Sequence, residues 1–112
     1  KSEPLVILQI EHIEAVRNLD AILQVPDVDS ILIGPYDLST SMGKSGQFDD
    51  PELNEVFDIV CRKALAAGKS LGVYAENNYD RWLRRGVQYF GIINDTTAMM
   101  MGFKTMQERL HA

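Results

Sequence analysis

Cysteine is nearly absent from this chain of 112 residues, which contains only Cys61. A single cysteine cannot form a disulfide within the chain, so a disulfide-stapled scaffold is excluded. Basic residues are also few: 11 lysines and arginines stand against 16 acids, which gives a net charge of −5. This balance argues against nucleic acid or an anionic membrane surface as the main partner. The apolar runs are far too short to span a bilayer.

The chain has no internal repeat, no low-complexity segment and no glycine-rich phosphate loop. The first residues, Lys1 to Pro4, lead into an apolar segment without the layout of a signal peptide, so we expect a cytoplasmic protein. The content of 46% hydrophobic and 24% charged residues is that of an ordinary globular chain with one small core, and Cys61 is expected to belong to that core.

Short apolar segments alternate with helical patterns along the whole chain. The expected strands are Leu5–Ile10, Ile31–Ile33, Leu71–Ala75 and Tyr89–Ile93. The expected helices are His12–Val25, a helix from Pro51 closed by Gly68, a short one from Asn77 or Asn78 to Gly86, and a last one from about Asp95 to Leu110. Four strands that each precede a helix predict an α/β fold with a parallel sheet covered by helices.

Two further local expectations concern the connections. A polar segment rich in serine and glycine is expected to be a loop from Ser39 to Asp50, where Asp50 caps the helix that starts at Pro51. In the short helix that ends at Gly86, the apolar side chains are expected to point inward: Tyr79, Trp82 and Leu83.

A carboxylate follows each of the first two strands. Asp37 comes just after Gly34 and Pro35, which end the second strand, and Glu11 comes directly after the first. Ligands bind at this rim in open α/β sheets and in β/α barrels. Two such carboxylates form a hard oxygen pair that suits Mg²⁺ or Mn²⁺. The alternative is that Asp37 only caps the segment that follows it.

Gln9 lies two residues before Glu11 and therefore on the same face of the strand. Its amide can hydrogen-bond a substrate oxygen, or it can be a buried amide satisfied by neighbouring strands. His12 is adjacent to Glu11 in sequence, so its side chain should point the other way, and a structural or solvent-facing role is expected for it.

Four segments now carry a resemblance, and they occur in a specific order and spacing: Gln9-Ile10-Glu11, Gly34-Pro35-Tyr36-Asp37-Leu38-Ser39, Met42-Gly43-Lys44 and Gly46-Gln47-Phe48-Asp49-Asp50-Pro51. Together they resemble the metal-dependent (class II) pyruvate aldolases of the HpcH/HpaI type. The resemblance runs from about Leu5 to the last helix. It implies a carbon–carbon lyase that reversibly cleaves a 2-keto-3-deoxy or 4-hydroxy-2-oxo acid to pyruvate and an aldehyde.

The resemblance also implies an architecture. The four βα units would be the fifth to eighth units of a TIM (β/α)8 barrel, so residues 1–112 would form one partial domain, its C-terminal half. Related enzymes exchange their final helix between subunits, so the helix at about 95–110 is expected to pack against another chain in a homo-oligomer. Its apolar stripe suits such packing and consists of Met99, Phe103, Met106 and Leu110.

The resemblance assigns roles to a small set of residues. Glu11 and Asp37 would hold the divalent metal, Mg²⁺ or Mn²⁺ with Co²⁺ as an alternative, while Gln9, Asp37 and the Tyr36 backbone would orient pyruvate. The histidine base and the arginine of the family come from the first half of the barrel, and no residue here matches those motifs. We therefore expect activity from the full-length barrel and none from the 112-residue chain alone.

Two other functions stay open at this point. One is a non-catalytic half-barrel whose rim binds a metal. The other is a phosphate-binding α/β module that uses the loops after the third and fourth strands, although a glycine-rich loop that would favour it is absent from the sequence.

Overall fold

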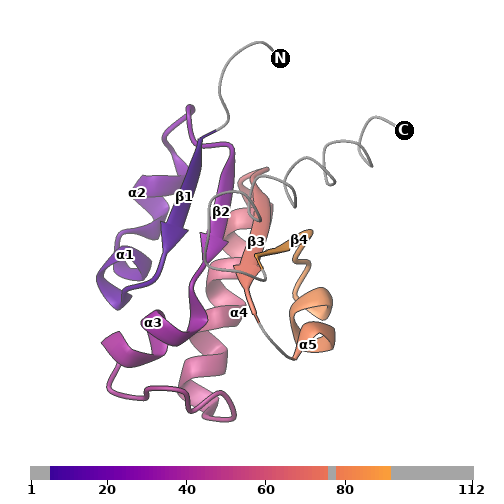
Figure 1. Cartoon of the computed structure of the whole chain (residues 1–112). Helices are drawn as coiled ribbons and strands as arrows, with labels where there is room; N and C mark the ends of the chain where they lie inside the picture. Colours follow the sequence, from indigo (N-terminus) through magenta and orange to yellow (C-terminus); the bar gives the residue numbers. More distant parts are fainter. Residues whose placement is uncertain (1–5, 76–77, 92–112) are drawn as a thin grey trace.

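The structure is a computed structural model that describes residues 6–75 and 78–91. A parallel sheet in the chain order β1-β2-β3-β4 forms its centre (Figure 1). Its strands are β1 (Ile7–Ile10), β2 (Ser30–Ile33), β3 (Ser70–Tyr74) and β4 (Tyr89–Gly91). The helices are α1 (Ile13–Arg17), α2 (Leu19–Leu23), α3 (Pro35–Ser41), α4 (Pro51–Ala66) and α5 (Tyr79–Arg84). The expected α/β fold with a parallel sheet is confirmed.

One face of the sheet packs against the helices. Strand residues such as Ile10, Ile33 and Val73 share a buried cluster with Leu19 of α2 and Phe57 of α4. Since side chains alternate along a strand, the residues between them point to the other face. All helices that contribute to this buried cluster therefore lie on one side, as they do in successive units of a β/α barrel, whereas a doubly wound sheet has helices on both sides.

The opposite face is built from aromatic rings set over glycines. Leu32 and Tyr89 are buried there and pack with Ile7 and Tyr74. The Tyr89 ring lies where a Cβ on Gly72 would stand, at 2.3 Å, so only glycine fits under that ring. The Tyr89 hydroxyl shares a hydrogen bond of 2.6 Å with Ser30 Oγ, which ties β4 to β2 across β3.

The first expected helix is divided in two. The sequence predicts one helix over His12–Val25, but α1 ends at Arg17 and α2 begins at Leu19. The break lies at Asn18, whose side-chain amide donates to the Glu14 carbonyl at 3.0 Å. Asparagine competes for backbone groups in this way and favours helix ends, which explains the interruption.

The segment expected to be a loop from Ser39 to Asp50 is helical at its start. Helix α3 already begins at Pro35 and continues to Ser41, and only the residues after it lack regular structure. Pro35 occupies the first helical position, where its fixed φ angle suits a helix and its missing N–H has no cost. The loop prediction is wrong for residues 39–41.

The other helix signals are confirmed in most details. Asp50 caps α4 by accepting from the Leu53 N–H at 2.9 Å, and this bond is the main cause of a lowered pKa of its carboxyl. Gly68 closes α4 with a φ of 77°. Cys61 is buried in the core, and burial raises the pKa of its thiol to about 12, so it is an inert packing residue.

The expected inward face of α5 is correct only for Trp82. That ring packs on Phe57 of α4 with centroids 4.9 Å apart, while Leu83 is 54% exposed and Tyr79 is 38% exposed. A helix as short as α5 presents only one residue per turn to α4. The prediction that Leu83 points inward is therefore wrong, and Tyr79 instead packs edge-on against Phe90.

The end of the chain lies outside the described residues. The predicted extension of the fourth strand to Ile93, the last helix at about 95–110 and its exchange between subunits all fall there. Within residues 6–75 and 78–91, no helix has both the length and the apolar content needed to cross a membrane.

Adding one methyl group at Gly72 should test the packing of the second face. In Gly72→Ala the new Cβ would overlap the Tyr89 ring, which the Ser30 hydrogen bond holds in place, so we expect a loss of about 1–3 kcal/mol in unfolding free energy by urea denaturation. In a Tyr89→Ala background the same substitution should cost much less. An equal cost in both backgrounds would show that the ring is not the obstacle.

Candidate active site

The C-terminal edge of β1 and β2 brings Gln9 and Glu11 together over Gly34. The parallel pairing of Ile10 with Ile33 is extended by a hydrogen bond of 3.0 Å from the Gly34 N–H to the Ile10 carbonyl. A Cβ at Gly34 would stand 3.2 Å from Glu11 Cβ, 3.4 Å from Gln9 Nε2 and 3.7 Å from Glu11 Oε2. The absence of a side chain at Gly34 thus lets both polar groups approach the strand end closely.

Asp37 lies in the first turn of α3, three residues after Gly34. Gly34 itself is the N-cap residue of α3, and no side chain caps this helix. The alternative that Asp37 only caps the next segment is therefore not supported. Both Asp37 and Glu11 are exposed, and the carboxylates have no hydrogen bond or ion pair to any residue that the structure describes.

These donors are compatible with a divalent metal ion. Among residues 6–75 and 78–91 there is no cluster of three or more His, Cys, Asp or Glu residues able to hold one. From this described part of the chain, an ion at this edge could take the two carboxylates of Glu11 and Asp37 as charged ligands, with water or substrate oxygens in its shell. Mg²⁺ and Mn²⁺ are commonly bound with such a sparse set of hard oxygen ligands.

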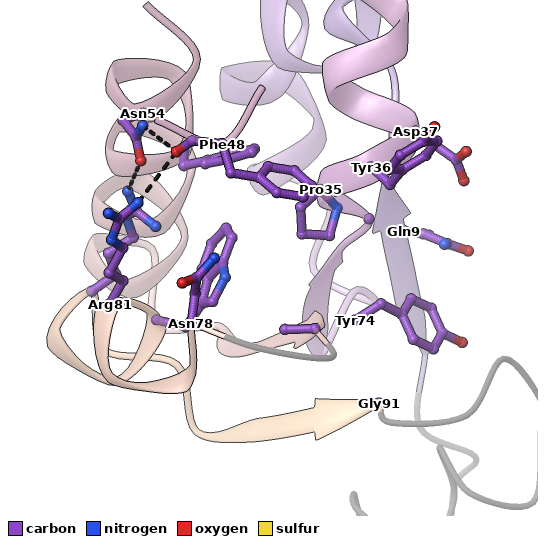
Figure 2. Close-up of a pocket in the computed structure, with 15 residues that line it drawn as sticks. Gln9, Pro35, Tyr36, Asp37, Phe48, Asn54, Tyr74, Asn78, Arg81 and Gly91 are labelled. Carbon is purple, nitrogen blue, oxygen red and sulfur yellow. Dashed lines mark hydrogen bonds between the residues drawn. The ribbon is translucent and has the colours of Figure 1, made fainter. Parts of the chain in front are cut away.

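A cavity of about 340 Å³ opens beside this edge. Figure 2 shows Gln9, Asp37 and Tyr74 on one side of it and Asn54, Asn78 and Arg81 on the other. The rest of the lining is mainly apolar and includes Pro35, Tyr36, Phe48, Phe57 and Trp82. Three of the predicted site residues, Gln9, Tyr36 and Asp37, line the cavity, whereas Glu11 lies next to it over Gly34 and is not part of its lining.

Two serine hydroxyls hold α3 in position. Ser39 is fully buried, donates to the Tyr36 carbonyl at 2.6 Å and accepts from the Gly46 N–H at 3.0 Å. Ser41 donates to the Leu38 carbonyl at 2.7 Å and accepts from the Ile13 N–H at 2.9 Å. Ser41 belongs to α3, which carries Asp37, and Ile13 begins α1, which follows Glu11. The Ser41 hydrogen bond therefore connects the helix of Asp37 to the segment of Glu11.

His12 has the structural role expected for it. It is the N-cap of α1, and its Nδ1 accepts from the Glu14 N–H at 3.1 Å. This bond fixes the turn that leads from Glu11 into α1.

The polar side of the cavity was missed by sequence reasoning. Arg81 donates to the Phe48 carbonyl at 3.3 Å and to the Asp49 carboxylate at 2.9 Å. Arg85 donates to Asp58 at 2.6 Å and to Asn54 Oδ1 at 2.7 Å. The two arginines are one helical turn apart, and that spacing is the one sequence signal that they share a face. Charged residues on a short helix otherwise indicate only a solvated surface.

Residues 1–100 match the family model described as HpcH/HpaI aldolase/citrate lyase. The chain belongs to this family. It is 35% identical over 106 residues to the 4-hydroxy-2-oxo-heptane-1,7-dioate aldolase of Klebsiella pneumoniae, an alignment that covers 93% of this chain and 40% of the relative. It is 34% identical over 105 residues to the hydroxypyruvate/pyruvate aldolase of Agrobacterium fabrum, with coverages of 92% and 40%.

A solved structure supports the same family assignment. The HpcH/HpaI aldolase from Desulfitobacterium hafniense matches with a TM-score of 0.69 and 30% identity, over 95% of this chain and 42% of that one. The resemblance found in the sequence motifs is thus confirmed. The chain spans about two fifths of the length of the curated HpcH/HpaI relatives given above.

The Ser41 bridge makes a testable contribution to this site. In Ser41→Ala the Ile13 N–H loses its partner, and we expect a loss of about 1 kcal/mol in unfolding free energy by urea denaturation. Thr40→Ala is the matched control: in the described part of the chain the Thr40 hydroxyl makes two exposed hydrogen bonds, to the Tyr36 carbonyl and to Ser45, so its loss should stay within about 0.5 kcal/mol. Equal losses in the two variants would contradict the bridge.

Proposed function

We propose that the protein carrying this chain is a divalent-metal-dependent aldolase, which reversibly cleaves a 2-keto-3-deoxy or 4-hydroxy-2-oxo acid to pyruvate and an aldehyde. The observation that carries this proposal is that Gln9 and Glu11 meet over Gly34, the N-cap of the helix whose first turn holds Asp37, in a member of the HpcH/HpaI family. The name of the Klebsiella relative describes an aldolase for an acid of this kind.

In this proposal Glu11 and Asp37 hold Mg²⁺ or Mn²⁺, with Co²⁺ as an alternative. The chemistry that such an ion supplies is Lewis-acid stabilisation of the negative charge that develops on the keto oxygen as the carbon–carbon bond breaks. The open oxygens of both carboxylates support this role, since neither is committed to another group in the described part of the chain.

The remaining polar groups of this edge would orient pyruvate. The Gln9 amide can donate a hydrogen bond from Nε2 to an oxygen of pyruvate, next to Gly34. The Tyr36 and Asp37 N–H groups lie in the first turn of α3, where backbone donors have no partner within the helix. Holding the oxo acid through these fixed donors lowers the entropic cost of reaching the reactive geometry.

We further propose that the four βα units serve as the fifth to eighth units of a (β/α)8 barrel within a cytoplasmic homo-oligomer, with the last helix exchanged between subunits. The one-sided helix layer and the sequential strand order support the barrel. The family's histidine base and arginine have no match in this chain, so they would come from the first half. The acidic net charge of −5 fits small-molecule partners better than nucleic acid or membrane lipid.

Replacing one carboxylate with its amide tests the metal assignment. In Asp37→Asn a neutral amide replaces a charged oxygen ligand, and calorimetry should show Mn²⁺ binding weakened by at least about tenfold. Gln9→Ala is the control: it should keep the affinity for Mn²⁺ and lose affinity for pyruvate. Unchanged Mn²⁺ binding in Asp37→Asn would overturn the assignment, and weaker Mn²⁺ binding in Gln9→Ala would make Gln9 a support of the metal ligands instead.

The 112-residue chain by itself should bind Mn²⁺ and pyruvate weakly and show no aldol cleavage at the rate of the complete barrel. Loss of a general base alone typically costs about 10²–10⁴-fold in rate. A coupled assay for pyruvate release, run on the chain and on the complete protein side by side, measures this difference. Robust turnover by the chain would contradict the expected division of the catalytic groups, and absence of turnover in the complete protein would favour a non-catalytic metal-binding barrel.

A further inference from the structure

One polar side chain at the edge of the sheet is not used by the proposed function. Figure 2 shows the amide of Gln9, the carboxylate of Asp37 and the hydroxyl of Tyr74 turned to the same side, away from the wall that carries Arg81. Tyr74 is the last residue of β3 and is half-buried. Its hydroxyl therefore lies with the polar groups of the candidate active site and not with the arginines.

The strand register places Tyr74 close to Glu11. Strand β2 lies between β1 and β3, and its last residue, Ile33, pairs with the residue before Glu11 and with the residue before Tyr74. The residues that follow in the three strands are Glu11, Gly34 and Tyr74, which therefore stand in one row at the C-terminal edge. Because Gly34 has no side chain, a ligand over it would have Glu11 on one side and Tyr74 on the other.

The Tyr74 ring is held in place by its neighbours. Tyr74 pairs with Gly91, and a Cβ at Gly91 would stand 2.6 Å from the ring, so the ring occupies space that only a glycine leaves open. The ring also packs with Leu32 and Tyr89, which are buried on the same face of the sheet. A side chain held in this way loses little conformational freedom when a ligand binds against it.

The polar groups on this face limit the kind of ligand that Tyr74 can bind. The hydroxyls of Ser30 and Tyr89 are buried and bond each other. In the described part of the sheet, this face carries no lysine or arginine that could pair with an anionic group. A tyrosine hydroxyl can donate one hydrogen bond and accept others, so it can bind a neutral hydroxyl group and still keep a contact with the protein.

We propose that Tyr74 contacts the aldehyde half of the substrate, and that its hydroxyl bonds a hydroxyl group on the carbon next to the aldehyde carbon. This inference rests on the proposed function, which places the oxo-acid end at Gln9, Glu11 and Asp37. The aldehyde half extends from the methyl carbon of pyruvate, and Tyr74 is the next side chain along the row of strand ends. Tyr74 is thus a specificity residue that favours 2-hydroxyaldehydes over alkyl aldehydes and takes no part in breaking the carbon–carbon bond.

Two aldehydes of equal size test this inference. Glycolaldehyde and propanal have the same number of non-hydrogen atoms, and a hydroxyl group in the first replaces a methyl group in the second. The complete protein, loaded with Mn²⁺, is given pyruvate and each aldehyde in turn, and kcat/KM for the aldol product is measured by chromatography. In Tyr74→Phe the ratio of kcat/KM for glycolaldehyde to that for propanal should fall about fivefold, as expected for one neutral hydrogen bond, while the value for propanal stays within about twofold.

The ratio is compared between variants because the two aldehydes differ in their own reactivity. Tyr89→Phe is the matched control: it removes a hydroxyl from the same face, where Ser30 already bonds it, so it should lower the stability of the fold and keep the ratio. Calorimetry should show the same Mn²⁺ affinity in Tyr74→Phe as in the wild-type protein, because both carboxylates stay in place.

The outcomes separate this inference from the proposed function. An unchanged ratio in Tyr74→Phe, or an equal loss for both aldehydes, would contradict the hydroxyl contact while the metal-dependent aldolase stands. A weaker affinity for Mn²⁺ in Tyr74→Phe, or an equal fall of the ratio in Tyr89→Phe, would also contradict it, since the effect would then come from the metal or from the packing of this face. If the complete protein forms no product from either aldehyde, the proposed function fails and the inference fails with it.

Discussion

The parallel pairing of β1 with β2 is the constraint on which the rest of the site depends. It aligns Ile10 with Ile33, and the bond from the Gly34 N–H to the Ile10 carbonyl carries the alignment one step beyond the strands. A slip of one residue would turn Gln9 and Glu11 to the opposite face, away from α3. The register is in turn held by packing, because Ile10 and Ile33 are fully buried under the helices. Apolar burial therefore sets the position of the polar groups.

Much of this arrangement could be predicted from the sequence because it depends on local signals. Short β-branched runs, a Gly-Pro strand end and the Asp50-Pro51 helix start are strong and independent of tertiary contacts. The same signals located Glu11 and Asp37 at strand ends. Helix α3 was missed because its Ser and Thr residues have low helix propensity, and it is stabilised instead by Ser39 and Ser41 contacts to distant segments. Those contacts have no sequence signature.

The side of the cavity that carries Arg81 and Arg85 was missed for a related reason. Arg81 lies in α5, a helix of six residues, and Arg85 is its C-cap residue. Their side chains bond Asp49, Asn54 and Asp58, which lie about 30 residues earlier in the chain. A charged residue in a sequence carries no information on whether its partner is water or a distant carboxylate. The tilt of Trp82 onto Phe57, which brings α5 close to α4, likewise appears only after the chain has folded.

The two sides of the cavity are held by forces of different strength. The side of Gln9 and Asp37 is fixed by strand pairing, buried isoleucines and the two serine bridges, so it resists displacement. On the other side, Arg81 is held by an ion pair with Asp49 that is open to solvent and so contributes little free energy. Substitutions at Asp49 or Arg81 would therefore alter this wall of the cavity without disturbing the strand register that positions the carboxylates.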